Sequence, residues 1–276
     1  MSTIVSIQDL SCLGKCSLTV TLPVVSAMGV GCAVLPTAVL STHTAFPHPH
    51  IADLSEHILP ILCHWQQVGA SFQGILTGYL ANPGQVDLAL ACIDGLGKCQ
   101  TVCDPAMGDH GRLYSGLDQT MVDAMGRLCR RADLILPNVT EGALLAGLPY
   151  PPQADEACCR RITQALHRRG MDHVLLTGMV SAPGKTGFFW SREGQQPFAY
   201  STDALPRSCH GTGDLFAAVV MGGLIRGMDV PTAGILAAEF VKRCIALTPA
   251  DSRFGSAFEP ELGWLAAETQ RLSPRA

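Results

Sequence analysis

The sequence predicts a single α/β domain over residues 1–276, with a mostly parallel central sheet, helices on both faces and a short antiparallel edge. Short apolar runs alternate along the chain with longer stretches of helical periodicity. Most of these runs are apolar on both faces, as is typical of strands that helices cover on both sides. Residues 173–201 hold three strand-like runs without an intervening helix, and they predict the antiparallel edge.

The individual elements follow from the same patterns. Helices are favoured where Ser, Asp or Pro opens a periodic apolar stretch, as at Ser17, Asp214 and Pro231. Ala-Pro-Gly at 182–184 and Glu-Gly at 193–194 form the turns of the antiparallel edge. The predicted strands are residues 4–7, 32–35, 74–77, 101–103, 134–136, 173–177, 187–190 and 198–201. The predicted helices are residues 17–28, 54–67, 86–96, 119–131, 154–169, 214–226 and 231–247.

The composition argues against a membrane, secreted or nucleic-acid-binding protein. Hydrophobic residues make up 47% of the 276 residues and charged residues 15%, which excludes disorder. Apolar runs stay well short of the roughly 20 residues of a membrane span, and the N-terminus has no signal-peptide pattern. A net charge of −4 offers no basic surface for nucleic acid. We therefore expect a cytoplasmic protein whose 12 cysteines are mostly buried thiols.

The most informative motif is Gly211-Thr212-Gly213-Asp214, at the start of a long apolar helix. Glycines let successive backbone N–H groups point at one cluster of oxygens, and the positive end of the helix dipole lies at the same place. These features predict a phosphate site. A carboxylate there repels phosphate unless it has another task, and accepting a proton from an attacking alcohol is such a task. The alternative is a tight turn in which Asp214 only caps the helix.

Polar residues follow the predicted parallel strands at their carboxyl ends. In an open α/β sheet this rim is where ligands bind. Each residue alone is an ordinary turn former or cap, but together on one rim they predict a site. These residues include Asp9, Tyr79, Asp104, Asp109, Asn138, Glu141 and Thr177.

Three carboxylates on this rim have the chemistry of a Mg²⁺ site. Asp104, Asp109 and Glu141 offer hard oxygen ligands, which Mg²⁺ takes in nucleotide sites while it keeps several waters. The sequence has no Gly-x-x-x-x-Gly-Lys-Ser/Thr, so the phosphates are not held by a P-loop. Asn138 and Tyr114 are candidate donors to phosphate oxygens.

With these motifs the chain resembles the ribokinase-like superfamily and, within it, the pyridoxal (vitamin B6) kinases. Six motifs match in order and span nearly the whole chain: Ser6-Ile7-Gln8, Ser41-Thr42-His43-Thr44, Thr77-Gly78-Tyr79, Cys103-Asp104-Pro105 with Gly108-Asp109, Pro137-Asn138 with Glu141, and the stretch from Gly211 to Ala218. The resemblance implies a ribokinase-like fold and phosphorylation of the 5′-hydroxymethyl group of pyridoxal, pyridoxine or pyridoxamine. It also implies a homodimer that uses MgATP, with a K⁺-like ion as a possible activator.

The resemblance assigns roles to single residues as well. Asp214 would be the base, and Gly211 and Gly213 the anion hole. Asp104, Asp109 and Glu141 would face the phosphates and Mg²⁺. The residues that would contact ATP are Tyr114, Asn138, Thr177 and Thr212. Those that would line the pyridine pocket are Asp9, Thr44 and Tyr79.

The sequence also departs from the family pattern. Asp9-Leu10-Ser11 follows Gln8 where pyridoxal kinases have Ser-His, and Gly14-Lys15-Cys16-Ser17 replaces their Gly-Asn. His210 is shared with hydroxymethylpyrimidine kinases, which carry Cys in place of Asp214, so this activity is the alternative. A vitamin B6 storage protein is a third interpretation, against which Asp214 argues. Cys209 is either a small neighbour of the cradle or a thiol that adds to the aldehyde of pyridoxal.

Overall fold

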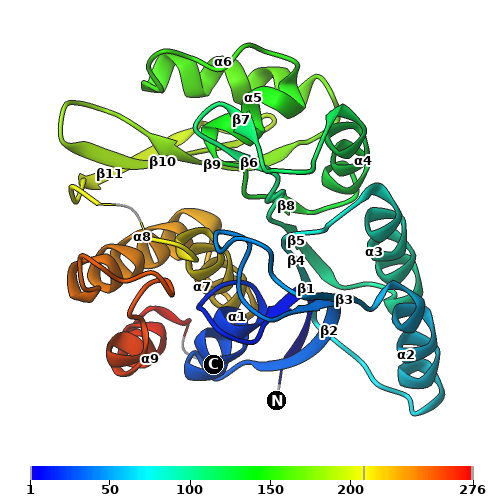
Figure 1. Ribbon diagram of the computed structural model, residues 1–276. Helices are drawn as coiled ribbons and strands as arrows, with labels where there is room; N and C mark the ends of the chain where they lie inside the picture. The colour runs from blue at the N-terminus through cyan, green and yellow to red at the C-terminus, as the bar shows by residue number, and fades with distance from the viewer. Residues whose placement is uncertain (1, 208, 275–276) are drawn as a thin grey trace.

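The protein is built around one nine-stranded sheet, seen in the computed structural model of Figure 1, which describes residues 2–207 and 209–274. The strands lie in the order β11-β10-β9-β8-β5-β4-β1-β2-β3. Their bounds are β1 Thr3–Ser11, β2 Gly31–Leu40, β3 Ile51–Asp53, β4 Gly74–Thr77, β5 Gln100–Cys103, β8 Leu134–Ile135, β9 His173–Met179, β10 Lys185–Arg192 and β11 Phe198–Asp203. All eight predicted strands are present among them.

The centre of the sheet is parallel, as predicted. The neighbouring pairs from β2 through β1, β4, β5 and β8 to β9 are all parallel. β10 and β11 continue the sheet in antiparallel fashion, which confirms the predicted edge. The opposite edge is antiparallel too, because β3 pairs with β2. Sequence patterns missed β3, because its three residues are too few for an alternating pattern.

Helices cover both faces of the sheet (Figure 1). One face is covered by α2 Ser55–Gln67, α3 Pro83–Leu96, α4 Gln119–Cys129, α5 Val139–Ala146 and α6 Glu156–His167. The other is covered by α1 Leu18–Ala27, α7 Thr212–Ile225, α8 Val230–Leu247 and α9 Leu262–Leu272, the last preceded by the short helix η1 Glu259–Glu261. Each layer of helices encloses its own apolar core against the sheet. None of the helices in the described ranges is long and apolar enough to cross a membrane.

Three unpredicted elements lie outside the main alternation. These are α5, α9 and a two-stranded hairpin made of β6 Gly108–Asp109 and β7 Arg112–Leu113. The sequence does hold a signal for α5, because Asn138 and Glu141 have the spacing of a capping box, and the structure forms both of its hydrogen bonds. The hairpin has only two residues in each strand, which is too short for a periodic pattern.

The first strand is longer than predicted. Asp9 was expected just beyond the end of a strand, but β1 continues to Ser11 with a bulge between Gln8 and Leu10. Beyond Ile7, β1 pairs only with β2, because its pairing with β4 stops there. Between Gln8 and Leu10 the register advances two residues on β1 but three on β2, so the extra residue lies in β2 opposite Asp9. Asp9 therefore belongs to the strand itself and does not follow it.

Candidate active site

The glycine turn before α7 forms the centre of the site. Gly211 is the N-cap of α7 and has a φ of 80°, a left-handed conformation that glycine adopts without strain. A side chain there would overlap the carbonyl oxygen of Lys15. Gly213 is exposed, and a Cβ on it would meet only Asp104, with 3.9 Å to Oδ2. Gly213, in the first turn of α7, therefore lies next to the carboxylate of Asp104.

Asp214 lies in the first turn of α7 but does not cap the helix, because the N-cap is Gly211. Its carboxylate instead lies near the backbone N–H of Ser17, which favours the charged form. Burial raises the pKa of Asp214 to about 6, and the nearby charge of Asp9 contributes. A carboxyl group that titrates near neutral pH is suited to accept a proton and to release it again.

Asp9 is buried beside Asp214 and is held by two serines. Ser17 Oγ donates to Asp9 Oδ1 at 2.6 Å, and Ser11 Oγ donates to Oδ2 at 3.3 Å. Burial raises the pKa of Asp9 although both hydrogen bonds favour its charged form. Tyr79 is close enough for the charge of Asp9 to add to burial in raising the pKa of the phenol. We call Asp9, Ser17 and Asp214 the base side of the site.

Thr44 is not brought into this group. Its side chain is exposed and forms no hydrogen bond with any described residue. The adjacent His43 is buried instead, with Nε2 3.0 Å from the carbonyl oxygen of Arg253 and its ring 4.8 Å from that of His210. Burial lowers the pKa of His43, whereas the charge of Asp9 acts in the opposite direction. From this motif we predicted Thr44 for the pyridine pocket, whereas the buried member of the motif is His43.

We call Asp104, Asp109 and Glu141 the phosphate side, and Glu141 is its most constrained member. Glu141 Oε1 accepts hydrogen bonds from the N–H groups of Met107, at 3.1 Å, and Gly108, at 3.5 Å. Its Oε2 accepts from the N–H of Asn138 at 2.9 Å. Burial raises the pKa of Glu141 to about 8 despite these donors. Both oxygens are thus occupied in holding the start of α5 against the loop after β5.

Asp104 differs from Glu141, because its carboxylate accepts no hydrogen bond from any residue in the described ranges. It is buried after β5, and its main chain is fixed by a hydrogen bond from its N–H to the carbonyl oxygen of Thr77. Burial and then the charges of Glu141 and Asp214 raise its pKa well above the usual value. A buried carboxylate without donors is costly unless a cation or proton accompanies it. Asp104 therefore fits a Mg²⁺ ligand better than Glu141 does.

The β6–β7 hairpin carries the remaining acidic residue. Asp109 is exposed, accepts a hydrogen bond from the N–H of His110, and has Oδ2 3.5 Å from His110 Nε2. Tyr114 follows the hairpin, and burial, then the charges of Glu141 and Asp104, raise its pKa. Among residues 2–207 and 209–274, no three His, Cys, Asp or Glu side chains converge closely enough to form a metal site by themselves. Most ligands of a Mg²⁺ ion here must be waters and phosphate oxygens.

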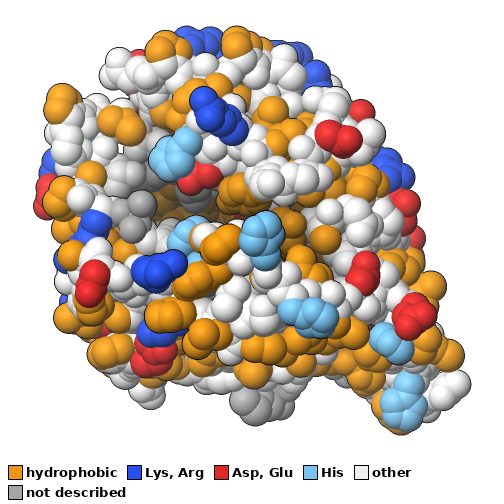
Figure 2. Space-filling model, in the orientation of Figure 1, with side chains coloured by type: hydrophobic (Ala, Val, Ile, Leu, Met, Phe, Trp, Pro, Cys, Tyr) orange, Lys and Arg blue, Asp and Glu red, His pale blue; other side chains and the backbone are white. Residues whose placement is uncertain are grey.

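The other residues predicted to bind ATP lie on the same rim. Asn138 uses Oδ1 to accept from the N–H of Glu141 and Nδ2 to donate to the carbonyl oxygen of Gly108, so its amide is largely committed. Thr177 pairs with Asn138 in a parallel bridge and is half-buried. Thr212 Oγ1 is 3.3 Å from the carbonyl oxygen of Cys209. Figure 2 shows this face of the molecule as hollowed, with acidic, His and basic side chains around the hollow.

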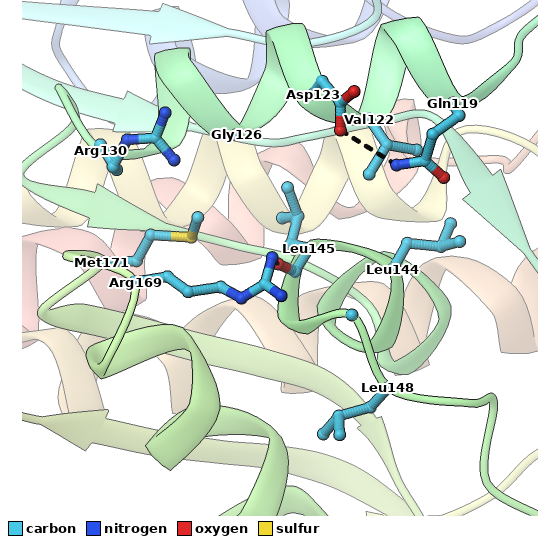
Figure 3. A pocket seen from close by; sticks show the side chains of 11 residues that line it. Gln119, Val122, Asp123, Gly126, Arg130, Leu144, Leu145, Leu148, Arg169 and Met171 are labelled. Atoms are coloured by element: carbon cyan, nitrogen blue, oxygen red, sulfur yellow. Dashed lines mark hydrogen bonds between the residues drawn. The ribbon is translucent and has the colours of Figure 1, made fainter.

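A separate pocket of about 500 Å³ lies away from these carboxylates, between α4, α5 and the loop after α6 (Figure 3). Its floor includes Leu145 and Met171, and its rim carries Arg130 and Arg169. Arg169 Nη1 donates to the carbonyl oxygen of Leu145, near the C-terminus of α5. Arg130 is the C-cap residue of α4. Both arginines thus lie at the negative ends of helix dipoles, which accounts for their positions without a ligand.

Comparisons with known proteins agree with this fold. The model of the phosphomethylpyrimidine kinase family matches residues 22–260. Pyridoxal kinase from Lactobacillus plantarum superposes with a TM-score of 0.90 and is 33% identical, with 98% of this chain and 99% of that chain covered. A candidate phosphomethylpyrimidine kinase from Bacteroides thetaiotaomicron, in a crystal form with pyridoxal, superposes with a TM-score of 0.90 and is 34% identical in sequence. The match covers 96% of this chain and 95% of that chain.

A curated relative also matches this chain in sequence over most of its length. The pyridoxine/pyridoxal/pyridoxamine kinase of Bordetella bronchiseptica is 28% identical over 248 residues, with 85% of each chain covered. For some other curated relatives the matched part is about half of the relative's length.

Proposed function

Because this chain belongs to the phosphomethylpyrimidine kinase family and resembles a solved pyridoxal kinase over nearly its whole length, we propose that it phosphorylates vitamin B6. The acceptor is the 5′-hydroxymethyl group of pyridoxal, pyridoxine or pyridoxamine, and the donor is ATP. The observation that carries the proposal is the placement of Asp214 beside the glycine turn, with a pKa near 6 and Asp104 next to Gly213.

The reaction follows from this arrangement. Asp214 takes the proton of the substrate hydroxyl, and the oxygen forms a bond to the γ-phosphorus of ATP. The bond from that phosphorus to the bridging oxygen of ADP breaks, and its electron pair leaves with ADP. Backbone N–H groups of the turn at Gly211 and Gly213 stabilise the charge on the transferred phosphoryl group. Asp9 and Tyr79 border the place of the vitamin ring.

The phosphate side supports ATP as a substrate and Mg²⁺ as its companion ion. Asp104 would hold Mg²⁺, because its carboxylate is free of donors, while Glu141 fixes the surrounding backbone. The ion supplies charge neutralisation between the phosphates. Tyr114, Asn138, Thr177 and Thr212 remain the proposed contacts of ATP, and Asp109 a proposed outer ligand. K⁺ as an activator, a homodimeric assembly and a cytoplasmic location are proposed from the family resemblance.

The alternative activity is phosphorylation of hydroxymethylpyrimidine. The family description and the match to a thiamine biosynthetic bifunctional enzyme of Arabidopsis thaliana favour it. Asp214 argues for the vitamin B6 branch, because hydroxymethylpyrimidine kinases generally carry Cys at that position.

One experiment separates the candidates. ADP release is measured with pyridoxal, pyridoxine, pyridoxamine and hydroxymethylpyrimidine side by side, at saturating MgATP. We expect at least one B6 vitamer to give the highest kcat/KM. A higher value for hydroxymethylpyrimidine would assign the chain to thiamine synthesis. Tight binding of pyridoxal without ADP release would favour the storage protein.

A further inference from the structure

Ser17 lies where the two carboxylates of the base side meet. We propose that Ser17 is a positioning residue, which fixes Asp214 for proton transfer by contacting Asp214 and Asp9 at the same time. The inference rests on the proposed function, because it gives Asp214 the role of the base.

Two different groups of Ser17 make the two contacts. Its side chain is buried, and Oγ donates to Asp9 Oδ1 at 2.6 Å. Its backbone N–H lies near the carboxylate of Asp214 and favours the charged form of that group. Its carbonyl oxygen accepts from the N–H groups of Val20 and Thr21, which begins α1. One residue thus connects strand β1, helix α1 and helix α7 at the base.

The backbone of Ser17 has a conformation that a side chain disfavours. Its φ is 50° and its ψ is −127°, in a region populated mainly by glycine. Such residues persist only where the surroundings hold them, and they cluster at functional sites. The backbone of Lys15, two residues before Ser17, is fixed on both sides. Its N–H donates to the carbonyl oxygen of Phe254, and its own carbonyl oxygen lies against Gly211. A glycine would fit this backbone better, so the serine at this position requires another explanation.

The explanation lies in the charges. Asp9 and Asp214 have like charge and repel each other when both are ionised. In addition to Asp214, Asp9 faces His43, Cys16 and Tyr79. In addition to Asp9, Asp214 faces Asp104, Cys16 and Tyr114. None of these neighbours is a Lys or Arg. One fixed residue contacts both carboxylates, and within residues 2–207 and 209–274 no Lys or Arg forms an ion pair with either.

The experiment compares Ser17→Ala and Ser17→Gly with Ser11→Ala as the matched control. Ser11 also donates to Asp9, at 3.3 Å, but has no contact with Asp214. We expect kcat for pyridoxal to fall about 10- to 100-fold in both Ser17 variants, with KM for ATP unchanged, because a slightly misplaced group loses that much rate. Ser11→Ala should stay within about threefold of the wild type.

Thermal unfolding separates this role from a structural one. Ser17→Gly should melt at a higher temperature than Ser17→Ala, because glycine accepts the backbone conformation without strain. A stable Ser17→Gly protein with wild-type kcat would overturn the inference. Both Ser17 variants keep the backbone N–H and lose only the Oγ donor to Asp9, so the expected loss arises because that donor no longer holds the Ser17 backbone against Asp214. Equal losses in Ser11→Ala and Ser17→Ala would also overturn the inference, because any weakened contact with Asp9 would then account for the effect.

A readout that needs no turnover keeps this inference apart from the proposed function. ¹³C NMR of the aspartate carboxyl groups gives the pKa of Asp9 in the wild type and in the variants. Loss of the Ser17 donor should raise this pKa in both Ser17 variants, because the hydrogen bond favours the charged form. If the wild type shows no kinase activity, the proposed function fails while this titration still tests the contact. If the wild-type enzyme is active and the pKa of Asp9 is unchanged in the Ser17 variants, the positioning role is refuted and the proposed function stands.

Discussion

The base side and the phosphate side both contain buried carboxylates, but the surrounding chain uses them differently. On the phosphate side, three backbone N–H groups occupy both oxygens of Glu141, and Asp104 receives no such donors. On the base side, Asp9 and Asp214 share the donors of one residue, Ser17. Residue type therefore does not reveal which carboxylate does chemistry. The number of donors already bound to it separates a structural carboxylate from one that is free to act.

The largest effect should come from the base side. Replacing Asp214 by Asn preserves the shape of the side chain but removes its ability to accept a proton. We expect kcat to fall by about 10²–10⁴-fold, the usual contribution of a positioned general base. ATP binding, measured by calorimetry, should be preserved or improved, because a negative charge near the phosphates is lost. A variant that keeps more than about a tenth of kcat would show that another group takes the proton.

The stability of this variant provides the control. The folded-state pKa of Asp214, about 6, lies above the ordinary value of 3.8, so ionisation costs folding free energy above about pH 6. This cost falls as the pH drops below about 6 and is absent only well below 3.8, where the group is protonated in both states. At pH 8 the melting temperature of Asp214→Asn should therefore equal or exceed that of the wild type. A large decrease would mean that lost activity reflects misfolding.

On the phosphate side, Asp104→Asn should have the next largest effect. If Asp104 holds Mg²⁺, the Mg²⁺ concentration for half-maximal velocity should rise about 10-fold or more, because a charged ligand becomes neutral. The measurement is ADP release over a Mg²⁺ titration at constant free ATP, with Asp109→Ala as the exposed comparison. Equal Mg²⁺ dependence in Asp104→Asn and the wild type would exclude Asp104 as a ligand. A stronger effect in Asp109→Ala would move the metal to the hairpin.

Glu141→Gln should instead act on stability. An amide offers one acceptor oxygen in place of two, so at least one buried N–H among those of Met107, Gly108 and Asn138 loses its partner. An unsatisfied buried donor costs about 1–3 kcal/mol. For a chain of this size, we expect the melting temperature to fall by several degrees. If Glu141→Gln raises the Mg²⁺ concentration for half-maximal velocity and leaves the melting temperature unchanged, Glu141 binds the metal and the contrast with Asp104 is wrong.

The periodic part of the fold could be predicted from the sequence, because burial on both faces of a sheet leaves a continuous apolar signal. Each predicted strand and helix is present. Features that depend on pairing could not be predicted. The bulge opposite Asp9 and the extension of β1 along β2 beyond the end of its pairing with β4 have no local pattern in the sequence. The strand β3 likewise has too few residues for an alternating pattern.

For the site, the sequence supplied the residues but not their partners. The chemistry of the glycine turn pointed to Asp214, and the structure places its carboxylate against Ser17 and near Asp9. Glu141 was predicted as a third metal ligand and stays so as a prediction, but a sequence cannot show that both of its oxygens also accept hydrogen bonds from backbone N–H groups. The capping-box spacing with Asn138 was a signal that could have revealed this. His43 was missed because a buried histidine and an exposed threonine lie side by side in one motif.

The smallest expected effect concerns the pH dependence of the base side. Asp214 must be ionised to accept a proton, so kcat should decline as the pH falls below about 6. The charge of Asp9 contributes to raising the pKa of Asp214, so Asp9→Asn should lower that pKa and move the acid limb of kcat to lower pH. The measurement is kcat for pyridoxine from pH 4.5 to 9 at saturating substrates, with Ser11→Ala as the control. A shift to higher pH would mean that Asp9 supports the ionised base instead of opposing it, and the two carboxylates would then have to share a proton.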